Sequence, residues 1–204
     1  FYATILYNGA TWKGRTLNTS TTDAIEGFTT FGASGDPKRT VTGYYVRKML
    51  DPTNTTFVQN KNTQSWIEMR YAEVLLIMSE AKAQLGDFAS ATTYINQLRQ
   101  KRGLNALSLV NNNQAMAAVE HERKVELAFE GHRFWDLRRW RKAHLLLDNV
   151  KFTGHKISPN PTGLTYEVVS ADATNRSFST KLYYLPIPEN EVQLNGALTQ
   201  IKGW

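Results

Sequence analysis

The chain has 204 residues, which is enough for one domain with a sizeable hydrophobic core. Its 24 basic and 18 acidic residues give a net charge of +6, but the basic residues are spread among the acids, so nucleic-acid binding is permitted and not predicted. Cysteine is absent, which excludes disulfides and cysteine-bound zinc, and no run reaches the ~20 apolar residues of a membrane helix.

The beginning of the chain predicts short strands and loops. It starts at Phe1, with no basic-then-apolar signal segment, and residues 1–7 read as a strand that ends in the turn Asn8-Gly9. The composition of residues 8–62 is rich in Gly, Thr, Asn and Ser, which favours loops, with another short strand at 42–48.

Trp12 is the residue of functional interest in this region, because it lies in a loop bounded by glycines. A tryptophan face can stack on a sugar ring. The polar neighbours that could hydrogen-bond to the hydroxyls of the sugar are Asn8, Lys13 and Arg15. Trp12 can equally cover apolar surface of its own domain. The residues leave both interpretations open.

Residues 66–103 predict two helices in succession. The first has apolar residues at helical spacing, and the second, 88–102, places Ala91, Ile95 and Leu98 on one face. Gly86-Asp87 separates them and Gly103 ends the second. The pattern resembles the helix pair of a tetratricopeptide repeat. The apolar residues at helical spacing in the first helix are Ile67, Tyr71, Val74, Leu75 and Met78, and the pattern continues through Ala81 and Leu85.

Residues 121–140, HERKVELAFEGHRFWDLRRW, predict two helical segments hinged at Gly131. Glu122, Glu126 and Glu130 are expected on one side of a helix, where like charges repel each other unless nearby cations neutralise them. The nearby cations predict a partly buried ion-pair network that fixes helix packing, with Glu73 and Glu80 as further partners for the arginines. These cations are Arg123, Arg133, Arg138 and Arg139. Paired carboxylates for acid–base hydrolysis are the alternative, which the regular spacing fits less well.

No metal or cofactor site is predicted. His121 and His132 do not form a zinc-binding HExxH motif, because His121-Glu122 is followed by Arg123-Lys124-Val125, with valine where the motif needs its second histidine. After Asp148 the helical periodicity ends, so residues 148–204 predict an extended segment with one short strand at 166–169.

Four segments, in order, resemble the SusD/RagB family: RYAEVLL at 70–76, INQLR at 95–99, the stretch at 121–140, and YLPIPE at 184–189 with LTQ at 198–200. The resemblance implies a mainly α, SusD-like fold of tetratricopeptide-like helix pairs with long loops and a few short β-strands. Within it, residues 1–65 would form a strand and loop region, 66–147 a helical core and 148–204 an extended C-terminal segment. Family members reach such a first strand only after a long helical half, so we expect residues 1–204 to be the C-terminal part of the domain.

The resemblance also implies a function. Such proteins are lipoproteins on the outer face of the outer membrane of Bacteroidetes-type bacteria, anchored through a lipidated N-terminus that would lie outside this chain. They bind oligosaccharides or polysaccharides without catalysis and deliver them to a SusC-like TonB-dependent transporter. We therefore expect glycan binding with no enzymatic activity, and Trp12, Asn8, Lys13 and Arg15 are its candidate residues. A tetratricopeptide-like scaffold that mainly docks to the transporter is the alternative.

Overall fold

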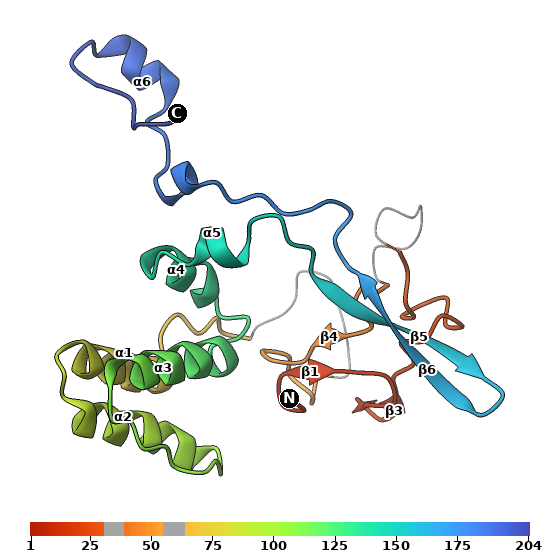
Figure 1. Ribbon diagram of the computed structural model, residues 1–204. Helices are drawn as coiled ribbons and strands as arrows, with labels where there is room; N and C mark the ends of the chain where they lie inside the picture. The colour runs from red at the N-terminus through yellow and green to blue at the C-terminus, as the bar shows by residue number, and fades with distance from the viewer. Residues whose placement is uncertain (31–38, 55–63) are drawn as a thin grey trace. The chain divides into compact units, whose positions relative to one another are not determined.

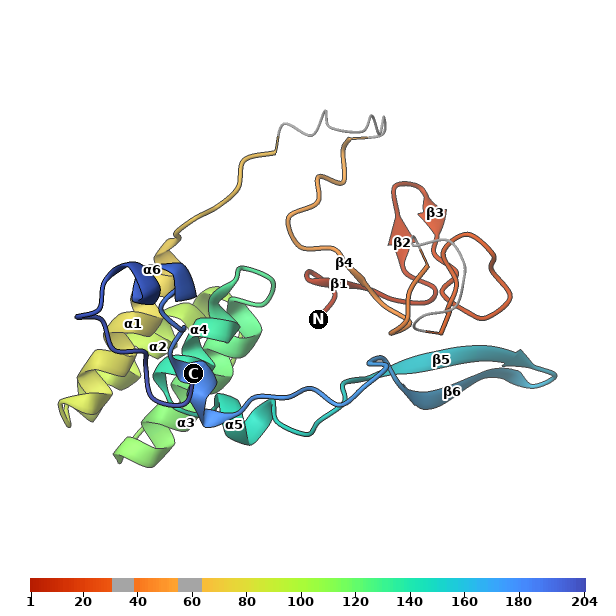
Figure 2. The same ribbon diagram turned by 90° about the horizontal axis from the view of Figure 1, so that it is seen from above.

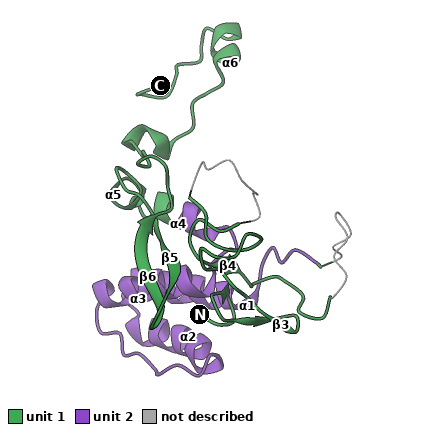
Figure 3. Cartoon of the chain, turned by 90° about the vertical axis from the view of Figure 1, so that its right-hand side faces the viewer, with its two compact units in different colours: residues 1–64, 137–204 green, residues 65–136 purple. Residues whose placement is uncertain are grey.

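The structure is a computed structural model that describes residues 1–30, 39–54 and 64–204 (Figure 1). The chain divides into two compact units, one formed by residues 1–64 with 137–204 and the other by residues 65–136 (Figure 3). The expected division of a family domain at residues 65 and 147 remains a prediction. None of the helices within the described ranges is long and apolar enough to cross a membrane.

The unit of residues 65–136 is built from helices. The second helix begins after Gly86, whose φ of +78° suits the tight turn, and the Asp87 side chain caps it by accepting a hydrogen bond from Ser90 N at 3.1 Å. The first helix packs against both the second and the third (Figure 1). The helices are α1 (Tyr71–Gln84), α2 (Phe88–Lys101), α3 (Asn112–Glu126) and the first part of α4 (His132–Arg139).

The buried face of α1 follows the apolar pattern of the sequence only in part, since it includes Leu75 but not Tyr71 or Val74. Tyr71 is 70% exposed and Val74 is also exposed, whereas Leu76 is fully buried, and Ile67 precedes the helix. Small residues share this face with Leu75 and Leu76, and the small side chains let α1 approach α2 closely enough for Ser79 Oγ to donate to Ala91 O at 2.8 Å. Because α1 carries apolar residues on both faces, the apolar periodicity alone does not show which face is buried. The buried residues of α1 are Ala72, Leu75, Leu76, Ser79 and Ala83.

The other helices follow the prediction closely. Ala91, Ile95 and Leu98 form the buried face of α2, and Gly103 follows its end with a φ of +67°. Asn111, the first of three consecutive asparagines, caps α3 by accepting a hydrogen bond from Gln114 N at 3.0 Å. The hinge at Gly131 is confirmed by its φ of +84°.

In its described residues, the other unit contains three two-stranded antiparallel sheets. The predicted strands at 1–7 and 42–48 are present as shorter segments that pair with each other, Ile5 opposite Val46 and Leu6 opposite Tyr45. Around them lies a small core of Leu6, Ala10 and Leu17. The strands are β1 (Ile5–Leu6), β2 (Thr11–Trp12), β3 (Arg15–Thr16), β4 (Tyr45–Val46), β5 (Thr153–Asn160) and β6 (Gly163–Ser170). Short helices complete the unit: α5 (Ala143–Leu146), a 3-10 turn (Thr180–Tyr183) and α6 (Glu189–Leu194).

The hairpin of β5 and β6 was not predicted at this length (Figure 2). Only residues 166–169 read as a strand, because proline and glycine punctuate the preceding segment. Pro159 is tolerated since it lies beside the tip, where Asn160 pairs with Gly163 and accepts a hydrogen bond from Thr162 N at 2.9 Å. Helix α6 was likewise missed within the segment expected to be extended.

The hairpin packs closely against the loop that leads into β4. His155 N donates to Thr42 O at 2.9 Å, Thr21 N donates to Ile157 O at 2.8 Å, and Ile157 is buried. The Tyr44 hydroxyl and His155 Nδ1 are hydrogen-bonded at 2.9 Å. The hairpin thereby fixes the position of the short strand β4.

Candidate functional site

Arg70 is the centre of an ion-pair network within the unit of residues 65–136. Its Nε and Nη2 donate to the two carboxylate oxygens of Glu130 at 2.6 and 2.9 Å, and its Nη1 donates to Glu126 Oε1 at 2.6 Å. Its Nη2 also donates to the Glu126 carbonyl at 2.6 Å. Since Arg70 directly precedes α1 and Glu126 ends α3, these bonds join the two helices.

The end of α2 supplies two further cations to the same stripe. Arg102 donates to both carboxylate oxygens of Glu126, at 2.9 and 2.6 Å, and Arg99 forms an ion pair with Glu122. Burial raises the pKa of Glu126, but hydrogen bonds from Arg102 and Arg70 outweigh it, so the pKa is lowered and the carboxylate stays charged. The predicted network is present, with Arg70, Arg99 and Arg102 as cations that sequence proximity had not indicated.

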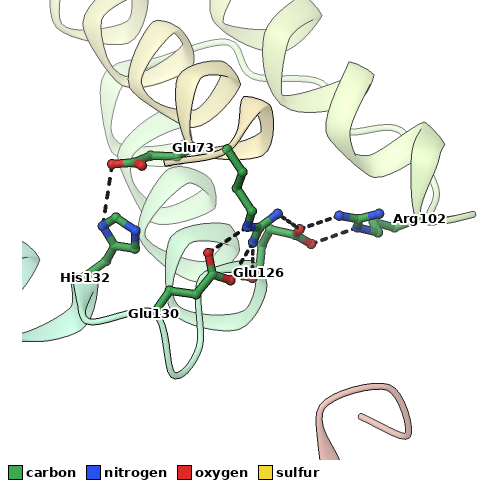
Figure 4. Close-up of polar contacts among 6 residues, drawn as sticks. Glu73, Arg102, Glu126, Glu130 and His132 are labelled. Atoms are coloured by element: carbon green, nitrogen blue, oxygen red, sulfur yellow. Dashed lines mark hydrogen bonds and ion pairs between the residues drawn. The ribbon is translucent and has the colours of Figure 1, made fainter. Parts of the chain in front are cut away.

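Two details of the predicted network need correction. Glu130 does not lie on the helix stripe, because α3 ends at Glu126, and it reaches Arg70 from the turn before α4. Glu73 pairs with a histidine of the 121–140 stretch instead of an arginine, with 3.5 Å between its Oε1 and His132 Nδ1 (Figure 4). Within the same stretch, buried Arg123 Nε donates to Asp136 Oδ2 at 2.8 Å.

These contacts support a structural role for the glutamates over acid–base chemistry. Glu122, Glu126 and Glu130 each bind an arginine guanidinium, and such pairing stabilises the ionised form instead of poising a proton donor. The charges hold the helices in register, as a buried network does when all its members are paired.

The second candidate site is the hairpin that carries Trp12. Lys13 and Gly14 form its turn with φ values of 49° and 78°, since a two-residue hairpin turn of type I′ needs positive φ at both central positions. The turn places Trp12 directly opposite Arg15. Trp12 is half-buried, and its inner part packs against the core of Leu6, Ala10 and Leu17.

Trp12 also forms part of the wall of a pocket of about 300 Å³. Most of the wall is apolar, and its charged groups are Arg15 and Glu26, whose atoms Nη2 and Oε2 lie 2.6 Å apart. An apolar surface with a few polar groups is typical of small-ligand sites. The lining residues are Leu6, Trp12, Arg15, Leu17, Ile25, Glu26, Tyr45, Val46 and Leu50.

The structure places the four candidate residues in different roles. Trp12 and Arg15 line the pocket together. Asn8 supports the loop instead, because its Oδ1 accepts a hydrogen bond from Thr19 N at 2.8 Å, and Lys13 Nζ donates to the carbonyl of Asn54. Sequence reasoning missed Glu26 and Tyr45, which only the fold brings to Trp12. Which of these residues contact a ligand remains a prediction.

The Arg15–Glu26 pair predicts a dependence of stability on pH. Hydrogen bonds from Arg15 and from Asn18 N lower the pKa of Glu26 below its usual 4.5. Because the folded pKa is the lower one, the stabilisation is complete above about pH 4.5 and is lost as pH falls through the folded pKa. We expect the free energy of unfolding in urea to differ less between pH 7 and pH 3 in Glu26→Gln than in the wild type. An equal pH effect in both proteins would contradict this role.

Known proteins identify the class to which this arrangement of helix pairs, loops and short strands belongs. The SusD family model matches residues 1–204, and the chain belongs to that family. Two curated relatives are SusD-like proteins P2 and P25 of Formosa agariphila. P2 is 34% identical over 147 residues, which cover 68% of this chain and 25% of that protein. P25 is 32% identical over 162 residues, which cover 76% of this chain and 27% of that protein.

Solved structures show the same fold. A SusD-like protein from Bacteroides fragilis aligns over 100% of this chain and 38% of its own, with a TM-score of 0.80 and 28% identity. A SusD superfamily protein from Bacteroides vulgatus aligns over 71% of this chain and 29% of its own, with a TM-score of 0.52 and 29% identity. The expected mainly α, SusD-like fold is therefore confirmed. The chain spans roughly a quarter of the length of the curated relatives.

Proposed function

We propose that the protein binds glycans without catalysis at the bacterial cell surface and that the Trp12 pocket forms part of its binding surface. The observation that carries the proposal is an indole that lines an apolar pocket together with a charged, hydrogen-bonding pair. Aromatic faces bind the apolar face of a sugar ring, while carboxylates and guanidiniums bind its hydroxyls. Membership of the SusD family supports the same ligand class.

In this proposal, the bound oligosaccharide passes to a SusC-like TonB-dependent transporter in the outer membrane. The protein is a lipoprotein of the outer face, anchored through a lipidated N-terminus in a part of the protein before Phe1. The glutamates of residues 121–140 support the absence of catalysis, because they are paired with arginines. Glycoside hydrolysis needs two carboxyl groups that face each other across a cleft.

Replacing Trp12 with alanine tests the site. In the full-length protein we expect at least about a tenfold loss of affinity for a glycan that the wild type binds in a screen, since buried aromatic anchors dominate binding energies. Isothermal titration calorimetry would measure it. Trp66 is the matched control, because it is an exposed tryptophan outside the pocket, and Trp66→Ala should bind like the wild type. Unchanged affinity in Trp12→Ala would mean that Trp12 only covers apolar surface.

A scaffold that docks to the transporter is the second candidate function. A larger pocket, of about 660 Å³, lies between the start of α1 and the end of α2 and combines an apolar floor with Arg70, Lys101 and Arg102. Grooves of helix pairs are common docking sites for peptides. Pull-down of the transporter that is retained in a protein with no glycan affinity would favour this candidate.

A further inference from the structure

Two cations besides Arg15 lie beside the Trp12 ring. Lys13 Nζ is 5.8 Å from the ring centroid and Arg47 Cζ is 5.7 Å from it. These distances are near the outer limit of a cation–π contact, so ring attraction holds neither charge tightly. The indole that forms part of the pocket wall therefore has positive charge close to it from two segments of the chain, β2–β3 and the residue after β4.

Neither of these two charges is neutralised by a carboxylate in the part of the chain that the structure describes. Lys13 Nζ donates to the carbonyl of Asn54, and Arg47 Nη1 donates to the carbonyl of Tyr2 at 2.7 Å. Arg15 differs, because Glu26 neutralises it. Carbonyl oxygens satisfy hydrogen-bond donors but carry no net charge, so two positive charges remain beside the ring.

Lys13 has a small effect on the pKa of the Asp51 carboxylate, but the two residues form no ion pair with each other among the described residues. Asp51 Oδ1 accepts hydrogen bonds from Thr53 N at 2.8 Å and from Thr53 Oγ1 at 2.7 Å. These bonds are the main reason that the pKa of Asp51 is lowered, and Lys13 contributes least. The surroundings of Trp12 thus keep an excess of positive charge.

We infer that the sugar bound at Trp12 is acidic, carrying a carboxylate or a sulfate ester. This inference rests on the proposed function, because it takes the Trp12 pocket as a glycan site. A charged sugar offers both features that the site matches: an apolar ring face for the indole, and an anionic group for Lys13 and Arg47. Charge-assisted hydrogen bonds to such a group are stronger than bonds to neutral hydroxyls. The same cations also attract anionic polysaccharide over longer distances at low salt.

Matched pairs of probes test the charge of the ligand in the full-length protein. Oligogalacturonate and its methyl-esterified form differ in the carboxylate, and κ-carrageenan oligosaccharide and its desulfated form differ in the sulfate. We expect calorimetry at 50 mM salt to show about tenfold tighter binding of one charged form than of its neutral partner. The preference should shrink when salt is raised to 500 mM. Which pair shows it identifies the anion.

Substitutions test whether these cations cause the preference. Arg47→Gln and Lys13→Gln should each lower affinity several-fold more for the charged form than for the neutral one. Lys151→Gln removes the same charge from a lysine that also donates to a carbonyl, that of Ala173 at 3.1 Å, but Lys151 has no cation–π contact with Trp12 among the described residues, so this variant should keep the full preference. Circular dichroism would confirm that each variant is folded.

The outcomes separate this inference from the proposed function. Equal affinity for charged and neutral forms would overturn the acidic ligand and leave glycan binding at Trp12 in place. A preference that survives in both Arg47→Gln and Lys13→Gln would overturn the assignment to these two cations. If neither these four probes nor any glycan of a broad screen bound, the proposed function itself would fail.

Discussion

Replacing Arg70 with methionine should lower the free energy of unfolding by about 3 kcal/mol, because it removes one member of a largely buried ion pair together with the hydrogen bonds that offset the burial of its partners. Glu130, whose side chain is only 4% exposed, would lose a guanidinium that binds both its oxygens. The carbonyl at the end of α3 would lose its donor as well. Methionine keeps much of the volume, so the effect reports the charge and hydrogen bonds. Urea unfolding followed by helical circular dichroism would measure it.

Arg102 provides the matched control for this prediction. It binds the same Glu126 carboxylate, but its side chain is 49% exposed, and exposed ion pairs contribute about 1 kcal/mol or less. Arg102→Met should therefore cost far less than Arg70→Met, since Arg70 continues to neutralise Glu126. Equal losses in the two variants would show that burial does not decide the strength of this network.

The ion-pair network could be predicted only in part from the sequence. Three glutamates at a spacing of four residues require cations, so ion pairing could be predicted from residues 121–140 alone. The identity of the cations could not, because Arg70 is separated from Glu126 by 56 residues and meets it only when α1 packs on α3. The buried face of α1 escaped prediction for a related reason. Ser79 is buried where α2 approaches α1 closely enough for its hydroxyl to donate to Ala91 O, and no local sequence pattern predicts that approach.

The Trp12 pocket was only partly predictable. Asn8-Gly9 and Lys13-Gly14 are local turn signals, and they drew attention to the tryptophan between them. Glu26, Tyr45 and Arg47 come to Trp12 from segments that carry no motif of their own. The resemblance to the SusD family predicted the ligand class but named none of these residues. Pocket walls assembled from separate loops need the fold before their residues can be identified.

Gly154→Ala should cost about 3 kcal/mol, because a methyl group at this position has no room. A Cβ there would lie 2.7 Å from the carbonyl oxygen of Thr42 and 2.8 Å from its carbonyl carbon, and backbone atoms cannot move aside as a flexible side chain can. The hairpin would have to move away from the loop, at the expense of the His155 N to Thr42 O hydrogen bond. Thermal and urea unfolding would measure the loss. Gly196→Ala is the control, since a Cβ at Gly196 would meet nothing within 4 Å, and it should change stability by less than about 0.5 kcal/mol.

This close contact also links the hairpin to the proposed binding site. Thr42 and Tyr44 lead directly into β4, and Tyr45 of β4 lines the Trp12 pocket and donates its hydroxyl to Glu26 O at 2.8 Å. Displacing the hairpin removes the support of the Tyr44–His155 hydrogen bond from this strand. We therefore expect Gly154→Ala to weaken glycan binding even though Gly154 does not line the pocket. If Gly154→Ala lost the expected stability but kept its affinity for glycan, β4 would keep its position through its pairing with β1 alone. The pocket would then be independent of the hairpin.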